Sequence, residues 1–179
     1  MRIEFLADLE TGNAQIDRQH RELVDWCNAL NDPDSAAVRG GRLSAALRFV
    51  IGYVDLHFAV EERVMAAAGY PGMEAHLKGH AYFRRAVAQL RRDLGSVDSA
   101  RTAALQLHHL ILDWFLQHIR LTDRSLADWL RQHAPELVVE EPGAALDELL
   151  RASGISAADL DGMRVVKPAE PPRRRRRVL

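Results

Sequence analysis

Apolar residues recur every three or four positions through most of the chain, which is the spacing of one face of an α-helix. Breaks that contain proline or glycine, such as Pro33, Gly40-Gly41 and Gly95, separate these periodic stretches. Alanine, leucine and arginine dominate and threonine is scarce, which favours helix over strand. The four predicted helices cover about residues 16–31, 43–68, 73–94 and 99–132.

Short connections join the second, third and fourth predicted helices, and helices joined in this way are antiparallel neighbours. We therefore predict an all-α fold: an antiparallel up-down four-helix bundle with a C-terminal extension beyond Pro135. Asp98 or Ser99 is the expected N-terminal cap of the fourth helix.

The chain changes character after Pro135, so we predict three segments. Residues 1–135 form the bundle, and residues 136–163 form an acidic linker. Within this linker, residues 144–153 can form a short helix, because three leucines fall on one face. Residues 164–179 are basic and lack apolar periodicity, which predicts a disordered tail ending in five arginines from Arg173 to Arg177.

Charge is unevenly distributed along the chain. The formal net charge is −1, but residues 134–163 carry −6 and residues 164–179 carry +6. A near-neutral bundle excludes a globally basic nucleic-acid binder. Three interpretations of the basic tail remain open: it binds an anionic partner, it folds back on the acidic segment, or it only aids solubility.

The location expected from the sequence is the cytoplasm. Cys27 is the sole cysteine, so no intrachain disulfide can form, which fits a reducing compartment. The first 13 residues contain three acids and lack the apolar region of a secretory signal. No apolar run approaches the roughly 20 residues of a transmembrane helix, so we expect no membrane-spanning segment.

Each predicted helix places at least one metal-binding side chain on its apolar, inward face. These residues are His20 on the first helix, His57 and Glu61 on the second, His76 and His80 on the third, and His118 on the fourth. Burying so many polar groups without partners would cost several kcal/mol. A metal bound between facing helices removes this cost. The alternative is that each histidine is an ordinary hydrogen-bonded core residue.

Asp123 needs a distorted helix to join this site. It follows His118 by five residues, and a regular helix would turn it by about 140° from that histidine. If Asp123 is a ligand, the helix must widen, as at a π-bulge, or bend near Leu121 and Thr122. The three other histidines are expected outside the site: His108, His109 and His133.

These residues and spacings resemble the hemerythrin family, and in particular its bacterial single-domain members, the bacteriohemerythrins. The resemblance covers about residues 14–133. It rests on four motifs: IDRQH at residues 16–20, HFAVEE at 57–62, HLKGH at 76–80 and WFLQHIRLTD at 114–123.

The resemblance implies a non-haem di-iron site with an oxo or hydroxo bridge. One iron would take His76, His80 and His118, the other His20 and His57, and Glu61 and Asp123 would bridge them. One position on the two-histidine iron would stay open for O2, and NO is a second candidate ligand. The resemblance also suggests the side chains that would line the O2 pocket: Phe58, Trp114, Phe115 and Ile119.

The function expected from this resemblance is reversible O2 binding for storage, delivery or scavenging, by a monomer that is not an enzyme. Imidazole-rich ligation differs from the carboxylate-rich sites of ferritin-like di-iron enzymes. Two alternatives remain: a sensor or adaptor for O2, NO or redox state that acts through the C-terminal extension, and a di-iron peroxidase or NO reductase.

Overall fold

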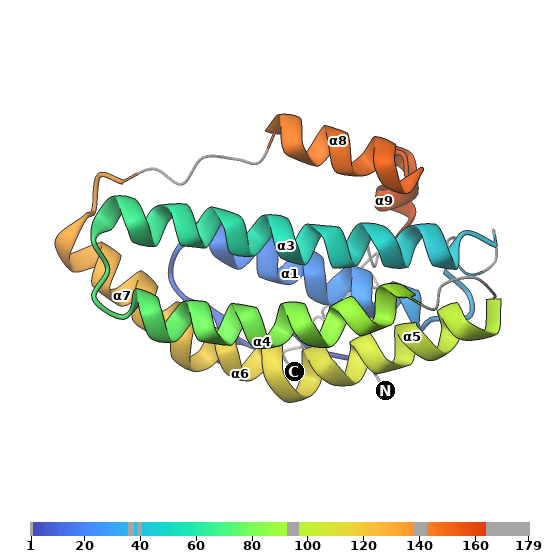
Figure 1. Ribbon diagram of the computed structural model, residues 1–179, viewed down its shortest axis with the longest axis horizontal. Helices are drawn as coiled ribbons and strands as arrows, with labels where there is room; N and C mark the ends of the chain where they lie inside the picture. The colour runs from blue at the N-terminus through green and yellow to red at the C-terminus, as the bar shows by residue number, and fades with distance from the viewer. Residues whose placement is uncertain (1, 36–37, 39–40, 93–96, 138–142, 164–179) are drawn as a thin grey trace, which may run out of the picture.

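The chain folds into a bundle of antiparallel helices, as the sequence predicts (Figure 1). The computed structural model describes residues 2–35, 38, 41–92, 97–137 and 143–163. A short 3-10 turn, η1 (Ala7–Leu9), precedes the bundle. The first three bundle helices are α1 (Ala14–Leu30), α3 (Leu43–Ala68) and α4 (Met73–Arg92).

Local signals fix the ends of these helices. The Asn13 side chain accepts hydrogen bonds from the backbone N–H groups of Gln15 and Ile16, which caps the start of α1. At the end of α3, Gly69 has a left-handed backbone with φ of 64°, which glycine adopts without steric cost. The chain therefore turns sharply at residues 69–72 and returns along α3 as α4.

The fourth bundle helix is continuous, but two of its segments are wound as π-helix instead of α-helix. Its segments are α5 (Val97–Leu110), η2 (Ile111–Phe115), α6 (Leu116–His118), η3 (Ile119–Asp123) and α7 (Arg124–His133). Both η2 and η3 are π-helical. The predicted cap at Asp98 or Ser99 is wrong, because both residues lie inside α5. Asp98 instead lies in the first turn, where a carboxylate interacts favourably with the free N–H groups.

Two apolar clusters fill the bundle. The larger cluster contains the aromatic core of α1 and α3, where Trp26 packs edge-on against Phe49 and Tyr53. The smaller one joins the end of α3 to α7 and is made of Val60, Val64, Met65, Leu126 and Leu130. Buried polar residues come from all four helices of the bundle, and those of α3 are His57 and Glu61.

α3 is long and apolar enough to cross a membrane by length and composition, with a mean hydropathy of 1.4 over its most apolar window. In the bundle, however, 61% of that window is buried. α1, α4, α5 and α8 pack around the helix. The core helix of a soluble protein passes the same test, so the result is weak evidence for a membrane span.

The described part of the C-terminal extension packs against the bundle. α8 (Gly143–Ser153) is the short helix that the sequence predicts, and it lies along the outside of α3 (Figure 1). A further helix, α9 (Ala157–Met163), was not predicted and contacts α1. Ile155, Leu160 and Met163 are buried in the larger apolar cluster. The predicted disordered tail, residues 164–179, lies outside the described residues.

Candidate metal centre

Seven buried side chains with metal-binding atoms converge inside the bundle. All seven are at most 5% exposed, although imidazoles and carboxylates are rarely buried this completely. They come from every helix of the bundle: His20 from α1, His57 and Glu61 from α3, His76 and His80 from α4, His118 from α6, and Asp123 from η3. They are the seven residues expected from the sequence.

The seven side chains form two overlapping groups, in each of which the ligand atoms lie within 4.8 Å of one another. The larger group contains His76, His80 and His118, and the smaller contains His20 and His57. Glu61 and Asp123 belong to both groups.

The two carboxylates turn one oxygen toward each group. Glu61 Oε2 lies 3.2 Å from His80 Nε2, and Glu61 Oε1 lies 3.7 Å from His57 Nε2. Asp123 Oδ1 lies 3.0 Å from His118 Nε2, and Asp123 Oδ2 lies 3.3 Å from His20 Nε2. Each carboxylate is therefore placed to bridge two cations.

The cluster fits metal ions better than it fits internal hydrogen bonds. All four oxygens of Glu61 and Asp123 are buried without a hydrogen-bond partner among the described residues, and so is His80 Nε2. Unsatisfied buried groups of this kind are costly and rare. Two atoms that bind one metal at about 2.1 Å along perpendicular directions lie about 3.0 Å apart. The Nε2 atoms of His118 and His76 are separated by 3.2 Å, close to that spacing.

A π-helical turn brings Asp123 into the cluster. η3 spans Ile119–Asp123, and the Arg124 N–H donates to the Ile119 carbonyl oxygen, five residues back. The wider turn compensates for the five-residue spacing from His118, and Asp123 is fully buried. The predicted widening of the helix at this point is confirmed. The other π-helical turn, η2, was not predicted.

Comparison with known proteins identifies the family. Residues 11–130 match the model of the hemerythrin HHE cation binding domain. This protein belongs to the hemerythrin family. The bacteriohemerythrin of Stenotrophomonas maltophilia strain R551-3 is 30% identical over 133 residues, which cover 74% of this chain and 84% of that protein. The bacteriohemerythrin of Pseudomonas paraeruginosa strain PA7 is 31% identical over 134 residues, 75% of this chain and 85% of that protein.

A eukaryotic relative is also similar. A hemerythrin-like protein of Naegleria gruberi is 26% identical over 112 residues, which cover 63% of this chain and 80% of that protein. The family and the buried cluster together indicate a metal site with two positions in this hemerythrin-family chain.

Burial and neighbouring charges set the ionisation states of the cluster residues, and all but His76 among those that follow favour metal binding. Burial raises the pKa of the Glu61 and Asp123 carboxyls, but the surrounding imidazoles outweigh it and hold both pKa values below the ordinary range. Burial lowers the pKa of His57 to about 4. At His76 burial also lowers the pKa, but the adjacent Asp123 and Glu61 carboxylates prevail and raise it to about 9. A metal must therefore displace a proton from His76 at neutral pH.

Two polar residues that sequence reasoning did not assign each contact the Nδ1 atom of a cluster imidazole. Gln19 Oε1 lies 2.9 Å from His57 Nδ1, and Glu62 Oε1 lies 2.9 Å from His80 Nδ1. Arg84 donates to the same Glu62 oxygen at 2.6 Å. Partners of this kind fix the tautomer and the direction of a ligating ring. Each contact joins two different helices, so helical spacing could not reveal it.

Aromatic rings surround the cluster unevenly. Phe115 lies edge-on to His20 and His57, with ring centroids 5.5 and 6.1 Å away. Phe58 stacks on His80 at 3.8 Å, and Trp114 stacks on His118 at 4.5 Å. Of the four predicted pocket residues, Phe115 therefore faces the two-histidine group. Phe58 and Trp114 stack on the three-histidine group, and Ile119 is buried in the larger apolar cluster.

The remaining three histidines belong to neither group. His109 and His133 are exposed. His108 is buried, with its Nδ1 atom 3.9 Å from Cys27 Sγ.

Proposed function

We propose that this hemerythrin-family chain binds O2 reversibly at a di-iron centre. Five imidazoles and two carboxylates would hold the irons, in the arrangement that the two overlapping groups suggest. Imidazole is a common ligand of iron, and carboxylate oxygens suit its harder, oxidised state. When bound, the iron pair would supply the electrons that O2 accepts as it binds.

The unequal size of the two groups is the observation that carries this proposal. The larger group offers five ligand atoms and the smaller offers four. If each iron has six positions and the two irons share one further bridging group, the iron of the larger group would have all its positions filled. The iron held by His20 and His57 would keep one position for an external ligand.

The protein around this position supports reversible binding. His20 and His57 are at most 1% exposed, and the Phe115 ring covers both of them. An apolar, water-poor setting hinders the protonation and release of reduced oxygen species. Gln19 holds the His57 ring in place without adding a charge.

The test is an optical spectrum of the reduced, iron-loaded chain before and after mixing with air. We expect a visible oxo-to-iron charge-transfer band that appears with O2 and bleaches when O2 is removed. Immediate and irreversible oxidation would overturn the proposal of reversible binding.

A sensor or adaptor is the second candidate, because the extension packs on a ligand-bearing helix. α8 contacts α3, which carries His57 and Glu61. The Arg42 side chain also donates to Asp159 of α9, with 2.7 Å between Nη1 and Oδ1. Deleting residues 164–179 tests the tail's part in this function. Unchanged O2 binding, with no loss of an anionic partner at low salt, would reject it.

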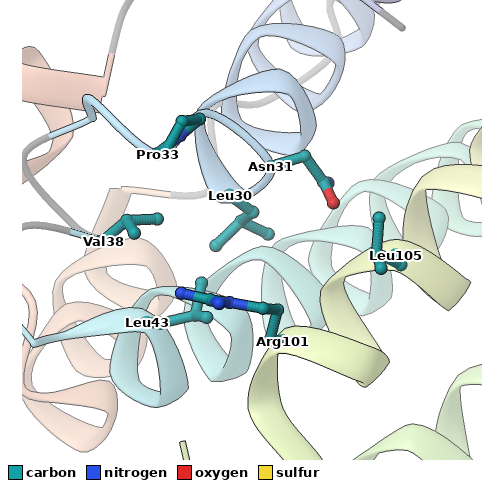
Figure 2. A pocket seen from close by; sticks show the side chains of 7 residues that line it. All are labelled: Leu30, Asn31, Pro33, Val38, Leu43, Arg101 and Leu105. Carbon is teal, nitrogen blue, oxygen red and sulfur yellow. The ribbon is translucent and has the colours of Figure 1, made fainter. Parts of the chain in front are cut away.

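The third candidate, an enzyme that turns over NO, has less support. Two of the surface hollows among the described residues are lined by no residue of the cluster. Figure 2 shows the first, a hollow of about 220 Å³ between the end of α1 and α5, lined by Leu30, Leu43 and Arg101 among others. Turnover of NO by the iron-loaded chain would favour an enzyme over a carrier.

A further inference from the structure

A row of three neighbouring rings runs from the buried cluster to the protein surface. The Trp114 ring stacks on His118, with centroids 4.5 Å apart and planes inclined by 21°. The Tyr82 ring follows at 6.1 Å from Trp114, inclined by 34°. Tyr82 is 51% exposed, whereas His118 is 5% exposed. The row therefore joins a predicted metal ligand to solvent through side-chain rings alone.

The sequence of α4 makes room for this row. A Cβ atom at Gly79 would lie 3.2 Å from His118 Cε1 and 3.4 Å from Trp114 Cζ2. A larger residue would therefore press on both rings, and glycine lets them lie flat against α4. Tyr82 follows Gly79 by three residues, on the same helix face, where it meets the outer side of Trp114.

The chemistry of these rings distinguishes them from the other aromatic contacts of the cluster. Indole and phenol groups lose one electron far more easily than a benzene ring does. The Phe58 and Phe83 rings also lie near Trp114, but neither can carry an oxidised state. Tyr82 is therefore the oxidisable ring next to Trp114 among the described ring contacts, and it is more exposed than Trp114.

We propose that Trp114 and Tyr82 carry oxidising equivalents from the metal centre to the surface, so that the chain reduces hydrogen peroxide with a small hydrogen-atom donor such as ascorbate. The proposal rests on the metal centre but not on reversible O2 binding. It gives the exposed edge of α4 a redox role that a simple O2 carrier does not need.

Hydrogen peroxide becomes two water molecules by accepting two electrons and two protons, and the iron pair, when bound, would pass these electrons to it. In each of two passages, Trp114 would release one electron toward His118. Tyr82 then returns one electron to Trp114 and releases its phenol proton to water. The resulting Tyr82 phenoxyl radical takes a hydrogen atom from ascorbate, so two ascorbate molecules are each oxidised by one electron.

Tyr70 offers a natural comparison, because it lies near the cluster without belonging to the row. Asp123 helps raise the pKa of Tyr70, although burial contributes more. The Tyr70 ring packs against Trp129, which stacks on His133, a histidine outside the cluster. No described ring contact joins this pair to a metal-binding imidazole.

The experiment mixes the oxidised, iron-loaded full chain with hydrogen peroxide, freezes it within milliseconds and records electron paramagnetic resonance spectra. We expect a tyrosyl radical signal in the unmodified chain and its loss in Tyr82→Phe. We also expect its loss in Trp114→Phe and its retention in Tyr70→Phe. Mass spectrometry of the peroxide-treated chain should find oxidation at Trp114 and Tyr82.

Several results would overturn the proposal. These are no tyrosyl signal in the unmodified chain, a signal that survives Tyr82→Phe or Trp114→Phe, or a signal lost in Tyr70→Phe. Iron content and the O2-dependent optical band are measured on the same samples. A normal band without the radical rejects only the ring pathway, whereas the radical without a reversible band rejects only O2 binding.

Discussion

Glu62 is a charged residue outside the cluster that contacts one of the cluster imidazoles, His80. It accepts from His80 and from Arg84, and Arg84 also lies over the Phe58 ring that stacks on His80. The pKa of Glu62 is low because hydrogen bonds from Arg84 and His80 outweigh the opposing effect of burial. Its carboxylate therefore stays ionised at neutral pH and would make His80 a stronger ligand in the proposed metal site.

We expect Glu62→Gln to weaken metal binding about 10-fold or more, because the amide keeps the shape of the side chain but loses its charge. The reduction potential of the centre should rise as well. Competition with a chelator and a redox titration measure the two effects. Glu74→Gln is the matched control, since Glu74 is exposed and pairs with Lys78 on the surface of α4. Equal affinities in both variants would contradict the role given to Glu62.

Cys27 shows how burial controls reactivity. Burial raises its pKa from the ordinary value of 9.0 to about 12. At pH 8 the reactive thiolate is thus about one molecule in ten thousand in the folded chain. We expect a thiol reagent to modify Cys27 only after the chain unfolds. Mass spectrometry measures the extent of this labelling. The free energy of unfolding should also fall between pH 9 and 12, because only the unfolded chain ionises there. Rapid labelling of the folded chain would contradict this.

At the scale of single residues, spacing along the sequence found the seven cluster residues but not their supports. His57 with Glu61, and His76 with His80, are visible because one turn of a helix separates them. Gln19 and Glu62 make contacts between helices, and these depend on how the helices rotate against each other. No periodicity within one helix contains that information.

At the scale of elements, the π-helical turn η3 behaves as one extra residue in the fourth helix. Its position could be inferred because His118 and Asp123 are five residues apart. The turn η2 could not be inferred, because no pair of recognisable ligands marks it. The same holds for α9, whose seven residues are too few to show a periodic pattern.

Removing one residue from η3 should leave the cluster intact. Without Leu121, which is 60% exposed, His118 and Asp123 would be four residues apart and would face the same way in a regular helix. We expect this deletion variant to fold and to retain two metals, measured by elemental analysis. Deleting Gln106 from the regular helix α5 is the control. It would turn every later residue by about 100° and abolish binding. Loss of metal in the Leu121 deletion would contradict this view of η3.

The contact of α8 with α3 depends on a glycine in the middle of a helix. A Cβ at Gly52 would come within 2.4 Å of a Leu149 methyl group. In Gly52→Ala, the higher helix propensity of alanine stabilises α3 by about 1 kcal/mol, and the displacement of Leu149 opposes this gain. We therefore expect faster hydrogen exchange in α8 with little change in global stability. Adding Leu149→Ala should restore contact between the helices. Unchanged exchange in Gly52→Ala would show that α8 does not rely on this fit.

At the scale of the whole molecule, the cluster lies where all the helices of the bundle meet, so its occupancy should affect global stability. Without metal, buried carboxylate oxygens in the core lack partners. We expect chelation to lower the Tm by about 10 °C or more, as several kcal/mol would do in a chain of this size. Calorimetry with and without chelator measures this. A chain whose Tm does not respond to chelation would contradict a metal-dependent core.

The bundle as a whole was the most predictable feature, because four long periodic stretches with short connections allow few arrangements. The way in which α8 and α9 pack was not predictable. The acidic composition of residues 134–163 predicts a linker. In the structure, however, three apolar residues of this segment are buried in the larger apolar cluster: Ile155, Leu160 and Met163. Composition averages over a segment, and packing depends on where its apolar residues lie.

The number of irons bound per chain decides whether the buried cluster is a di-iron site. Metal-free protein is titrated anaerobically with ferrous iron, passed through a desalting column and analysed for iron, beside the matched variants Glu61→Gln and Glu74→Gln. We expect two irons per unmodified chain, two in Glu74→Gln and fewer than two in Glu61→Gln. One iron or none in the unmodified chain, or two in Glu61→Gln with unchanged affinity, would contradict a di-iron site.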